Sequence, residues 1–392
     1  MSATACMILS ASMMAPLWPQ DARVGSSDTT PIWIDALGIE AGVVMTVDSL
    51  TTSATDMARA TGQSIENGGE LRRFRFDLRG QAAPDIKWRT HFDTTEGDPF
   101  LLDIWAEANL SEAASLRFGR FREPMGLEGL VSSKYIAFTE RSSPIDAFAP
   151  GRANGVMFDT NWADGSAGTS LGIFSPADAW DEDIHEDALH ATGRLTWLPV
   201  EQEDEQRLLH VGAALHHRES LRGSERFSAR PAAHLLPKLV DTGSFVADRV
   251  NISGLELLYI DGPVMLQAEY LAAATERPGA SEVHFDGAYV QGTWCLTGES
   301  RSYSRSKRSP KAIKPRTSIR DGGVGAWELA LRFSELDLTD ADVRGGELRN
   351  RLLGLNWFAS EHLRMTFDWV HTEHKVSDQS AELFLVRMQF AF

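Results

Sequence analysis

The sequence predicts an all-β protein, a transmembrane antiparallel β-barrel of about sixteen strands with loops folded into its interior. Three observations lead to this prediction. Apolar and polar residues alternate with a period of two over many segments of about ten residues, which is typical of strands. The connections between these segments are alternately short and long. The last segment keeps its alternation up to the final residue, Phe392.

The composition agrees with a barrel and argues against other classes. Of the 392 residues 43% are hydrophobic, yet no run of about 18 apolar residues occurs, so no transmembrane helix is expected. The formal net charge of -17 argues against nucleic acid as a partner. Eleven Trp and nineteen Phe are enough for aromatic girdles at two membrane interfaces. The two cysteines, Cys6 and Cys295, give no disulfide framework.

The N-terminal segment indicates export. Residues 1–22 are a run of small and apolar residues followed by polar sequence, which resembles a secretory signal peptide without its positively charged start. We therefore expect a signal peptide at 1–22, an N-terminal segment at 23–41 and the barrel at 42–392.

The alternation is clearest in residues 71–79 and 86–93, where one face is aromatic and the other charged. We expect the aromatic faces to contact lipid and the charged faces to contact water. The lipid-facing set is Phe74, Phe76, Trp88 and Phe92, and the water-facing set is Arg73, Arg75, Lys87 and Arg89. A soluble sandwich would also alternate, so this pattern alone does not choose between the two folds.

The remaining strands are predicted from the same alternation, which is strong in some segments and weaker in others. In residues 102–109, Leu102 and Ile104 share the apolar face and Asp103 lies on the opposite one. The predicted strands lie at 42–48, 102–109, 116–122, 154–162, 168–175, 188–198, 209–216, 252–260, 264–270, 284–297, 327–333, 349–358, 363–369 and 384–392.

The lengths of the connections support a barrel with both termini in the periplasm, because every second connection then faces outside. Long connections lie at 49–69, 123–153, 176–187 and 218–251, and short ones at 80–85, 111–114, 163–167, 199–206, 261–262 and 359–361. Residues 298–324 form a long connection on the periplasmic side. Either the strand count slips at this point or the segment has a role inside the barrel.

The connection 123–153 is the most informative loop. Loops of this length in a compact domain are usually functional or disordered. This one carries aromatic residues such as Tyr135 and Phe138 among interspersed cations, so we expect it to be ordered. The interpretation is that it folds into the lumen and narrows it.

Several motifs occur in an order that resembles a known family. They are RRFRFDLRG, FGRFREPMGLE, FTERS, PGRANGV, GRLTWLP, GPVMLQAEY, YVQGTWCLTGESRSY, GAWELALRFSELDL and LGLNWF. Over residues 42–392 the sequence resembles the phosphate-selective porin O and P family of bacterial outer-membrane proteins.

This resemblance implies an outer-membrane homotrimer surrounded by lipid, which passes small anions by passive diffusion. Phosphate or polyphosphate is the favoured solute, with no cofactor and no chemical step. It also implies a periplasmic connection that folds back into the lumen, and a constriction of arginines and lysines. A terminal Phe that closes an alternating strand resembles the assembly signal of bacterial outer-membrane barrels.

No catalytic or metal site is predicted. Glycine-rich phosphate loops, zinc-spaced His/Cys sets and Gly-x-Ser-x-Gly elbows are absent from the sequence. His185 and His190 stand five apart among acids, and an acidic surface loop explains them better than a metal site. His216 and His217 are adjacent, so on a strand they face opposite ways.

The candidate anion-binding residues are cationic, because guanidinium groups stay charged and donate paired hydrogen bonds to phosphate. Four arginines recur every four residues from Arg218 to Arg230, although a solvated loop balanced by Glu219 and Glu225 would give the same pattern. The candidate pore-lining residues are Arg73, Arg75, Lys87, Arg89, Arg122, Lys134, Arg141, Arg152, Arg218, Arg222, Arg226 and Arg230.

The net negative charge conflicts with anion transport at first sight. Acids crowd the turns and outer loops, and exposed charges are screened beyond a Debye length of about 8 Å, so local charge decides selectivity. Three alternatives stay open: a general or cation-leaning porin, a structural barrel plugged by its loops, and a soluble all-β binding protein.

Overall fold

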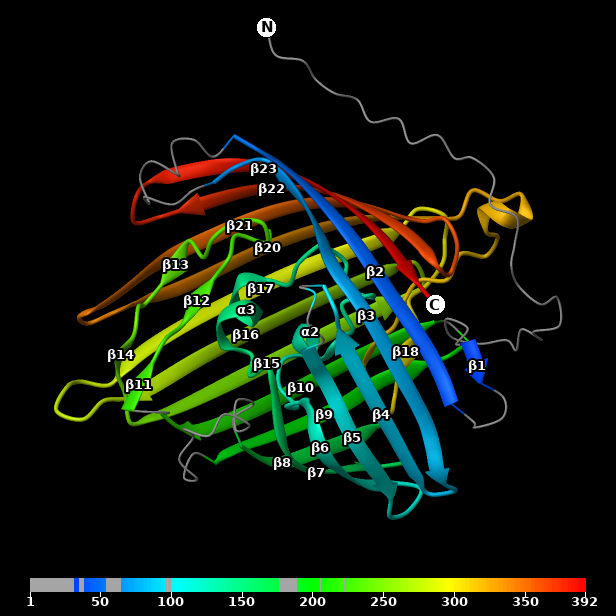
Figure 1. The fold of residues 1–392 in the computed structure, drawn as a ribbon, viewed down its shortest axis with the longest axis horizontal. Coiled ribbons are helices and arrows are strands. Elements are labelled where there is room, and N and C mark those ends of the chain that lie inside the picture. The colour runs from blue at the N-terminus through cyan, green and yellow to red at the C-terminus, as the bar shows by residue number, and fades with distance from the viewer. Residues whose placement is uncertain are drawn as a thin grey trace, which may run out of the picture.

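The computed structural model is a closed antiparallel β-barrel with sixteen wall strands (Figure 1). It describes residues 32–34, 39–53, 65–95, 97, 100–175, 189–204, 206–220 and 223–392. The wall strands are β2 (Ile39–Thr52), β3 (Gly68–Ala83), β4 (Ile86–Asp93), β5 (Phe100–Asn109), β6 (Ala114–Arg122), β7 (Arg152–Trp162), β8 (Ala167–Ser175), β9 (His190–Gln202), β10 (Arg207–Glu219), β15 (Arg249–Asp261), β16 (Val264–Glu276), β17 (Val283–Cys295), β20 (Ala326–Asp340), β21 (Val343–Phe358), β22 (Leu363–His374) and β23 (Gln379–Ala391). The predicted fold and strand number are confirmed.

The barrel closes where β2 pairs with β23 on one side and with β3 on the other. A short strand, β1 (Ile32–Ile34), pairs with the start of β2 just beyond the end of β23. The first wall strand is longer than predicted, since it runs from Ile39 to Thr52 and takes up part of the predicted loop 49–69. The predicted loop 176–187 lies outside the described residues.

Smaller elements belong to the loops between the wall strands. They are α2 (Leu127–Leu130), α3 (Ser143–Phe148), β11 (Ser224–Glu225), β12 (Ser228–Ala229), β13 (Val240–Asp241), β14 (Phe245–Val246), β18 (Tyr303–Ser304), β19 (Ser309–Pro310) and the 3-10 helix η2 (Ile319–Asp321). In Figure 1 the C-terminus and β1 lie at the end of the barrel opposite to β11 and β14. Among the described residues no helix has the length and hydropathy needed to cross a membrane.

The polarity of the wall is inverted relative to that of a soluble protein. On β20, Leu331 and Phe333 are 56% and 37% exposed on the outer face. Arg332, which lies between them, and Glu328, three residues before Leu331, point inward and are 3% and 0% exposed. A soluble protein would bury the leucine and expose the charges. This pattern excludes the soluble binding protein and agrees with an outer face in contact with lipid.

A β-bulge corrects one predicted facing. Leu102 was expected on the apolar outer face with Ile104, but the structure buries Leu102 and exposes Ile104. The pairing of β4 with β5 shifts between His91 and Phe92, which leaves Leu102 as an extra residue. A bulge places two neighbouring residues on one side of the strand, so Leu102 follows Asp103 into the lumen.

The facing of β3 can be tested by cysteine labelling. Arg73 and Arg75 form ion pairs with Glu140 and Asp93, so the opposite residue Phe76 belongs to the outer face. We expect a water-soluble maleimide to react at Arg75→Cys and not at Phe76→Cys in liposomes, in a Cys295→Ser background. The reverse result would mean a one-residue slip, which flips every side chain. An arginine at a lipid-facing mid-membrane position should cost about 2–4 kcal/mol.

Candidate functional site

The inner loop, which we define as residues 123–151, folds into the lumen. It is fixed to the part of the wall opposite the strands that it connects, β6 and β7. Asp368 on β22 accepts a hydrogen bond from the Thr139 amide at 2.7 Å. Arg364 on the same strand donates to the Ile136 carbonyl at 2.8 Å. Asn356 on β21 donates to the Ala137 carbonyl at 2.8 Å. The predicted in-folding of this loop is confirmed.

Two carboxylates of the inner loop anchor it through buried ion pairs. Glu128 pairs with Arg332 on β20. Glu140 lies 2.9 Å from Arg72, 3.3 Å from Arg73 and 2.9 Å from Arg387. Removing one member of such a buried pair typically costs about 3–5 kcal/mol, because the remaining charge is left without a partner. The charges on these wall arginines are therefore used to hold the loop.

Arg72 reaches the lumen because of a second β-bulge. The pairing of β2 with β3 shifts between Thr46 and Val47, so Arg72 has no partner of its own on β2. In a regular strand Arg72 and Arg73 would face opposite sides. The bulge turns both toward Glu140.

The connection between β17 and β20, residues 296–325, which we expected on the periplasmic side, also enters the barrel. Arg308 contacts Asp159 on β7 at 2.6 Å, and Arg301 contacts Glu328 on β20 at 2.7 Å. Arg301 also donates to the Tyr135 carbonyl of the inner loop at 2.9 Å. The strand count does not slip at this point, and the expected in-folding of this connection is confirmed.

The outer loop, which we define as residues 223–246, packs against the inner loop. The Arg230 amide donates to Asp146 at 3.0 Å. The rings of Phe227 and Phe148 meet edge to face with centroids 5.6 Å apart. Together the two loops enclose a polar space at the centre of the barrel.

This central cavity has a volume of about 350 Å³. Four arginines and three carboxylates line it: Arg72, Arg122, Arg141, Arg230, Glu123, Glu140 and Asp146. Arg122 donates to the Gly129 carbonyl, and Arg141 donates to the carbonyls of Glu128 at 2.9 Å and Val131 at 2.7 Å. Within the described part of the chain, neither guanidinium has a carboxylate within ion-pair distance. Their charges remain available to a solute.

The predicted site residues divide by their partners. Six are ion-paired to carboxylates: Arg73, Arg75, Arg89, Arg152, Arg218 and Arg226. Five have no carboxylate partner among the described residues: Lys87, Arg122, Lys134, Arg141 and Arg230. Arg222 lies outside the described residues.

The three regularly spaced arginines that the structure describes, Arg218, Arg226 and Arg230, do not come together at one place. Arg218 binds Glu225 at 2.9 Å. Arg226 has a side chain that is 60% exposed and pairs with Asp241. Arg230 reaches the central cavity. The structure therefore distributes this motif between the barrel end, the solvent and the cavity.

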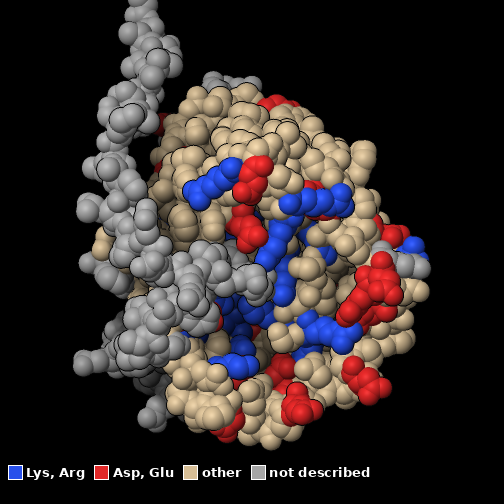
Figure 2. All heavy atoms as spheres, turned by 90° about the vertical axis from the view of Figure 1, so that its right-hand side faces the viewer, with Lys and Arg blue, Asp and Glu red and all other residues tan. Residues whose placement is uncertain are grey.

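The periplasmic mouth carries a further group of cations. Figure 2 shows Lys and Arg side chains gathered in the hollow at this end. Lys134 of the inner loop lies near this end, because Gln389 of β23 donates to its carbonyl at 3.3 Å, and its ammonium lies 5.6 Å from the Tyr135 ring centre. Burial lowers the pKa of Lys134 to about 8, an effect that nearby Asp77 opposes and that Arg79, Arg89 and Lys307 reinforce.

Lys134 should make the ion selectivity of the lumen depend on pH. A lysine with a pKa near 8 loses its positive charge as the pH rises from about 7 to about 9. We expect the reversal potential in a salt gradient to shift toward cations over this interval. Lys134→Gln should flatten the dependence, and Lys134→Arg should keep at the higher pH the reversal potential that the wild type has near pH 7. An equal pH response in Lys134→Gln would assign it to another group.

Comparison with known proteins agrees with this architecture. Residues 53–392 match the phosphate-selective porin O and P family. The chain belongs to this family. It is an outer-membrane channel protein and not an enzyme.

Individual relatives are distant. Porin O of Pseudomonas aeruginosa is 25% identical over 86% of both chains. An uncharacterized protein of Caulobacter vibrioides is 26% identical, covering 77% of this chain and 62% of its own. Among solved structures, an anion-selective porin from Comamonas acidovorans has a TM-score of 0.58 at 11% identity, covering 90% of this chain and 99% of its own. OmpT of Vibrio cholerae has a TM-score of 0.57 at 10% identity, covering 94% and 100%.

Proposed function

We propose that this porin passes small anions by passive diffusion and that phosphate is the favoured solute. The observation that carries the proposal is the pair of guanidiniums, Arg122 and Arg141, which face the central cavity with main-chain carbonyls as partners. A phosphate there would receive charge-assisted hydrogen bonds from planar groups that suit its geometry.

The electrostatics of the inner loop support an anion at this position. Burial lowers the pKa of Arg141, with Arg152 and Arg75 adding to the effect against the opposing carboxylates Glu128 and Glu140. A bound anion would compensate this cost. Because four arginines face three carboxylates, the cavity lining has one more positive than negative group. So small an excess fits a conducting site, where binding stays weak enough for the anion to leave.

The net charge of -17 does not conflict with this proposal. Most lumen arginines are neutralised by wall or loop carboxylates, so the few unpaired cations determine the local potential. Arg122 and Arg141 line the same cavity as Glu140, whose own charge is compensated by three arginines. The description of the family, phosphate-selective porin O and P, and the name of one similar structure, an anion-selective porin, lend further support.

The proposal is tested in planar bilayers. In a KCl gradient the reversal potential should have the sign of anion selectivity, and millimolar phosphate should reduce the chloride current. A cation-selective reversal potential would favour the general or cation-leaning porin. Absence of conductance from a correctly assembled protein would favour the plugged structural barrel.

We also propose that the protein is a homotrimer. The structural relative OmpT of Vibrio cholerae has been solved in a trimer form. Chemical cross-linking in outer membranes should give a ladder that ends at three chains, and a ladder that ends at one or two would contradict the proposal.

A further inference from the structure

Glu123, His190 and His216 meet where the inner loop leaves the wall. They come from three separate segments: the first residue of the inner loop, the start of β9 and the outer half of β10. Nδ1 of His190 lies 3.4 Å from one oxygen of Glu123, and Nδ1 of His216 lies 3.1 Å from the other. The side chains are 2%, 11% and 0% exposed, so this is a built cluster and not a surface coincidence.

These distances suit a metal ion. Two ligands bound at about 2.0–2.2 Å from a tetrahedral Zn²⁺ stand roughly 3.4 Å from each other. The planes of the His190 and His216 rings are inclined at 79° in an edge-to-face arrangement, with centroids 5.5 Å apart. One donor atom from each of the three residues lies within 4.8 Å of the other two. Two imidazoles and a carboxylate form a donor set for a borderline divalent transition metal.

Two further observations support the same interpretation. Thr192 donates to Glu123 at 2.5 Å and can orient the carboxylate from a second layer, while its 2.9 Å contact with Nδ1 of His216 is a hydrogen bond that a metal ion on this nitrogen would replace. Nε2 of His190 is buried without a hydrogen-bond partner in the described part of the chain. Buried imidazoles are normally satisfied at both nitrogens, so hydrogen bonds within the cluster leave it incomplete.

One group opposes a bound cation. Nη1 of Arg218 lies 3.4 Å from Nε2 of His216, while its other nitrogens are held by Glu225 at 3.2 and 2.9 Å. Its charge repels a metal ion and its N–H competes for the imidazole. Arg218 should therefore set the affinity of the site.

We propose that Glu123, His190 and His216 form a binding site for a divalent transition-metal ion of the Zn²⁺ class, with Nδ1 of His216, one ring nitrogen of His190 and the Glu123 carboxylate as ligands and water in the fourth position. This assignment departs from the prediction of no metal site made from the sequence. His185, the sequence neighbour considered with His190, lies outside the described residues.

The site adjoins the pore, because Glu123 also lines the central cavity. A divalent ion on this carboxylate compensates its negative charge and leaves the arginines of the cavity less opposed. Zn²⁺ should then strengthen the block of chloride current by phosphate. This consequence rests on the proposed function, whereas metal binding does not.

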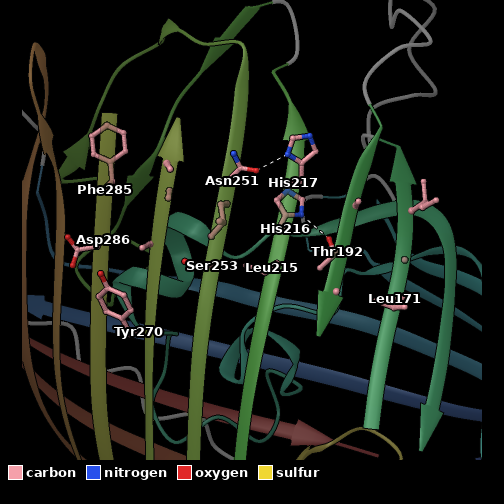
Figure 3. A pocket seen from close by; sticks show the side chains of 18 of the residues that line it. Leu171, Thr192, Leu215, His216, His217, Asn251, Ser253, Tyr270, Phe285 and Asp286 are labelled. Atoms are coloured by element: carbon pink, nitrogen blue, oxygen red, sulfur yellow. Dashed lines mark hydrogen bonds between the residues drawn. The ribbon is translucent and has the colours of Figure 1, made fainter. Parts of the chain in front are cut away.

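The adjacent histidine offers a matched control. Figure 3 shows His216 turned toward Thr192, and His217 beside Asn251. His217 is exposed and hydrogen-bonded to Asn251 at 2.8 Å, away from the cluster. His216→Gln and His217→Gln therefore remove the same chemical group at consecutive positions, one inside and one outside the proposed site.

Binding is measured on the purified full-length barrel in detergent by calorimetry with Zn²⁺ and by visible absorption with Co²⁺. We expect one equivalent per chain, a loss of affinity of at least about tenfold in His216→Gln and His190→Gln, and no change in His217→Gln. Arg218→Gln should bind more tightly. Heat-modifiable gel mobility confirms that each variant is folded.

Either of two outcomes would overturn the site: no stoichiometric binding by the wild type, or equal affinity in folded His216→Gln. If Zn²⁺ binds as expected but the wild-type pore is not anion-selective, the proposed function fails and the metal site stands. If the pore is anion-selective and Zn²⁺ does not bind, the reverse holds.

Discussion

Replacing Arg122 and Arg141 together by glutamate should turn the pore from anion toward cation selectivity. The two guanidiniums face the central cavity with only carbonyls as partners among the described residues, so the change reverses charges that no carboxylate balances. Phosphate block should weaken by at least about tenfold, since one charge-assisted hydrogen bond contributes about 1.5–3 kcal/mol and 1.4 kcal/mol is tenfold. Conductance should stay within a few-fold, because strand number and shear set the barrel diameter.

Arg226→Glu is the matched control for this experiment. Arg226 belongs to the regular arginine motif, but it is exposed and paired with Asp241 outside the cavity. Its replacement should leave the reversal potential unchanged. Arg122→Gln with Arg141→Gln gives a milder version that keeps the side-chain size. An unchanged reversal potential in the double glutamate variant would place the anion path elsewhere.

Deleting Phe392 should reduce the amount of barrel in the outer membrane to a small fraction of wild type, without blocking export. The Phe392 amide donates to the Val43 carbonyl at 2.9 Å, and its carbonyl accepts from Val43 at 3.2 Å, so this residue completes the β2–β23 seam. Its ring stacks on His362 with centroids 5.0 Å apart. Loss of two hydrogen bonds and a stacked ring costs a few kcal/mol, about 1 kcal/mol for each contact.

The measurement is heat-modifiable protein in outer-membrane fractions, with the periplasmic pool as a measure of export. Phe392→Tyr keeps the ring and the main chain and should assemble normally. Phe392→Ala removes the ring and keeps only the two main-chain hydrogen bonds to Val43. Wild-type assembly of the deletion variant would show that the terminal aromatic residue is dispensable.

The strands of the wall and the side that each residue faces could be predicted, because neighbouring residues of a strand point to opposite sides and differ in polarity. Leu331 and Arg332 differ in polarity and sit next to each other, so the sequence displays the inside and outside of β20 directly. Bulges escape this reasoning. Nothing near Arg72 or Leu102 marks them as extra residues, since a bulge depends on how two strands pair.

The site was predictable in kind and not in detail. A loop rich in cations predicted a charged lumen. Which of these cations are neutralised depends on contacts between distant parts of the chain. Glu128 and Arg332 are 204 residues apart. Arg226 meets Asp241 only because the outer loop forms a small hairpin. His190 and His216 become neighbours through the register of β9 with β10, which places His216 opposite Thr192.

The anchoring of the inner loop bears on how such channels can diversify. Glu128 and Glu140 are matched by Arg332 and Arg387, which follow 204 and 247 residues later in the chain. A chimeric porin that received this loop alone would place two acids against a wall without the matching arginines. The arginines of that wall would in turn lose the loop acids with which they had paired. Because Arg72 and Arg73 on β3 also hold Glu140, recombination between relatives should therefore succeed when β3 and β20–β23 travel with the loop. The heritable module of this pore is discontinuous in the gene.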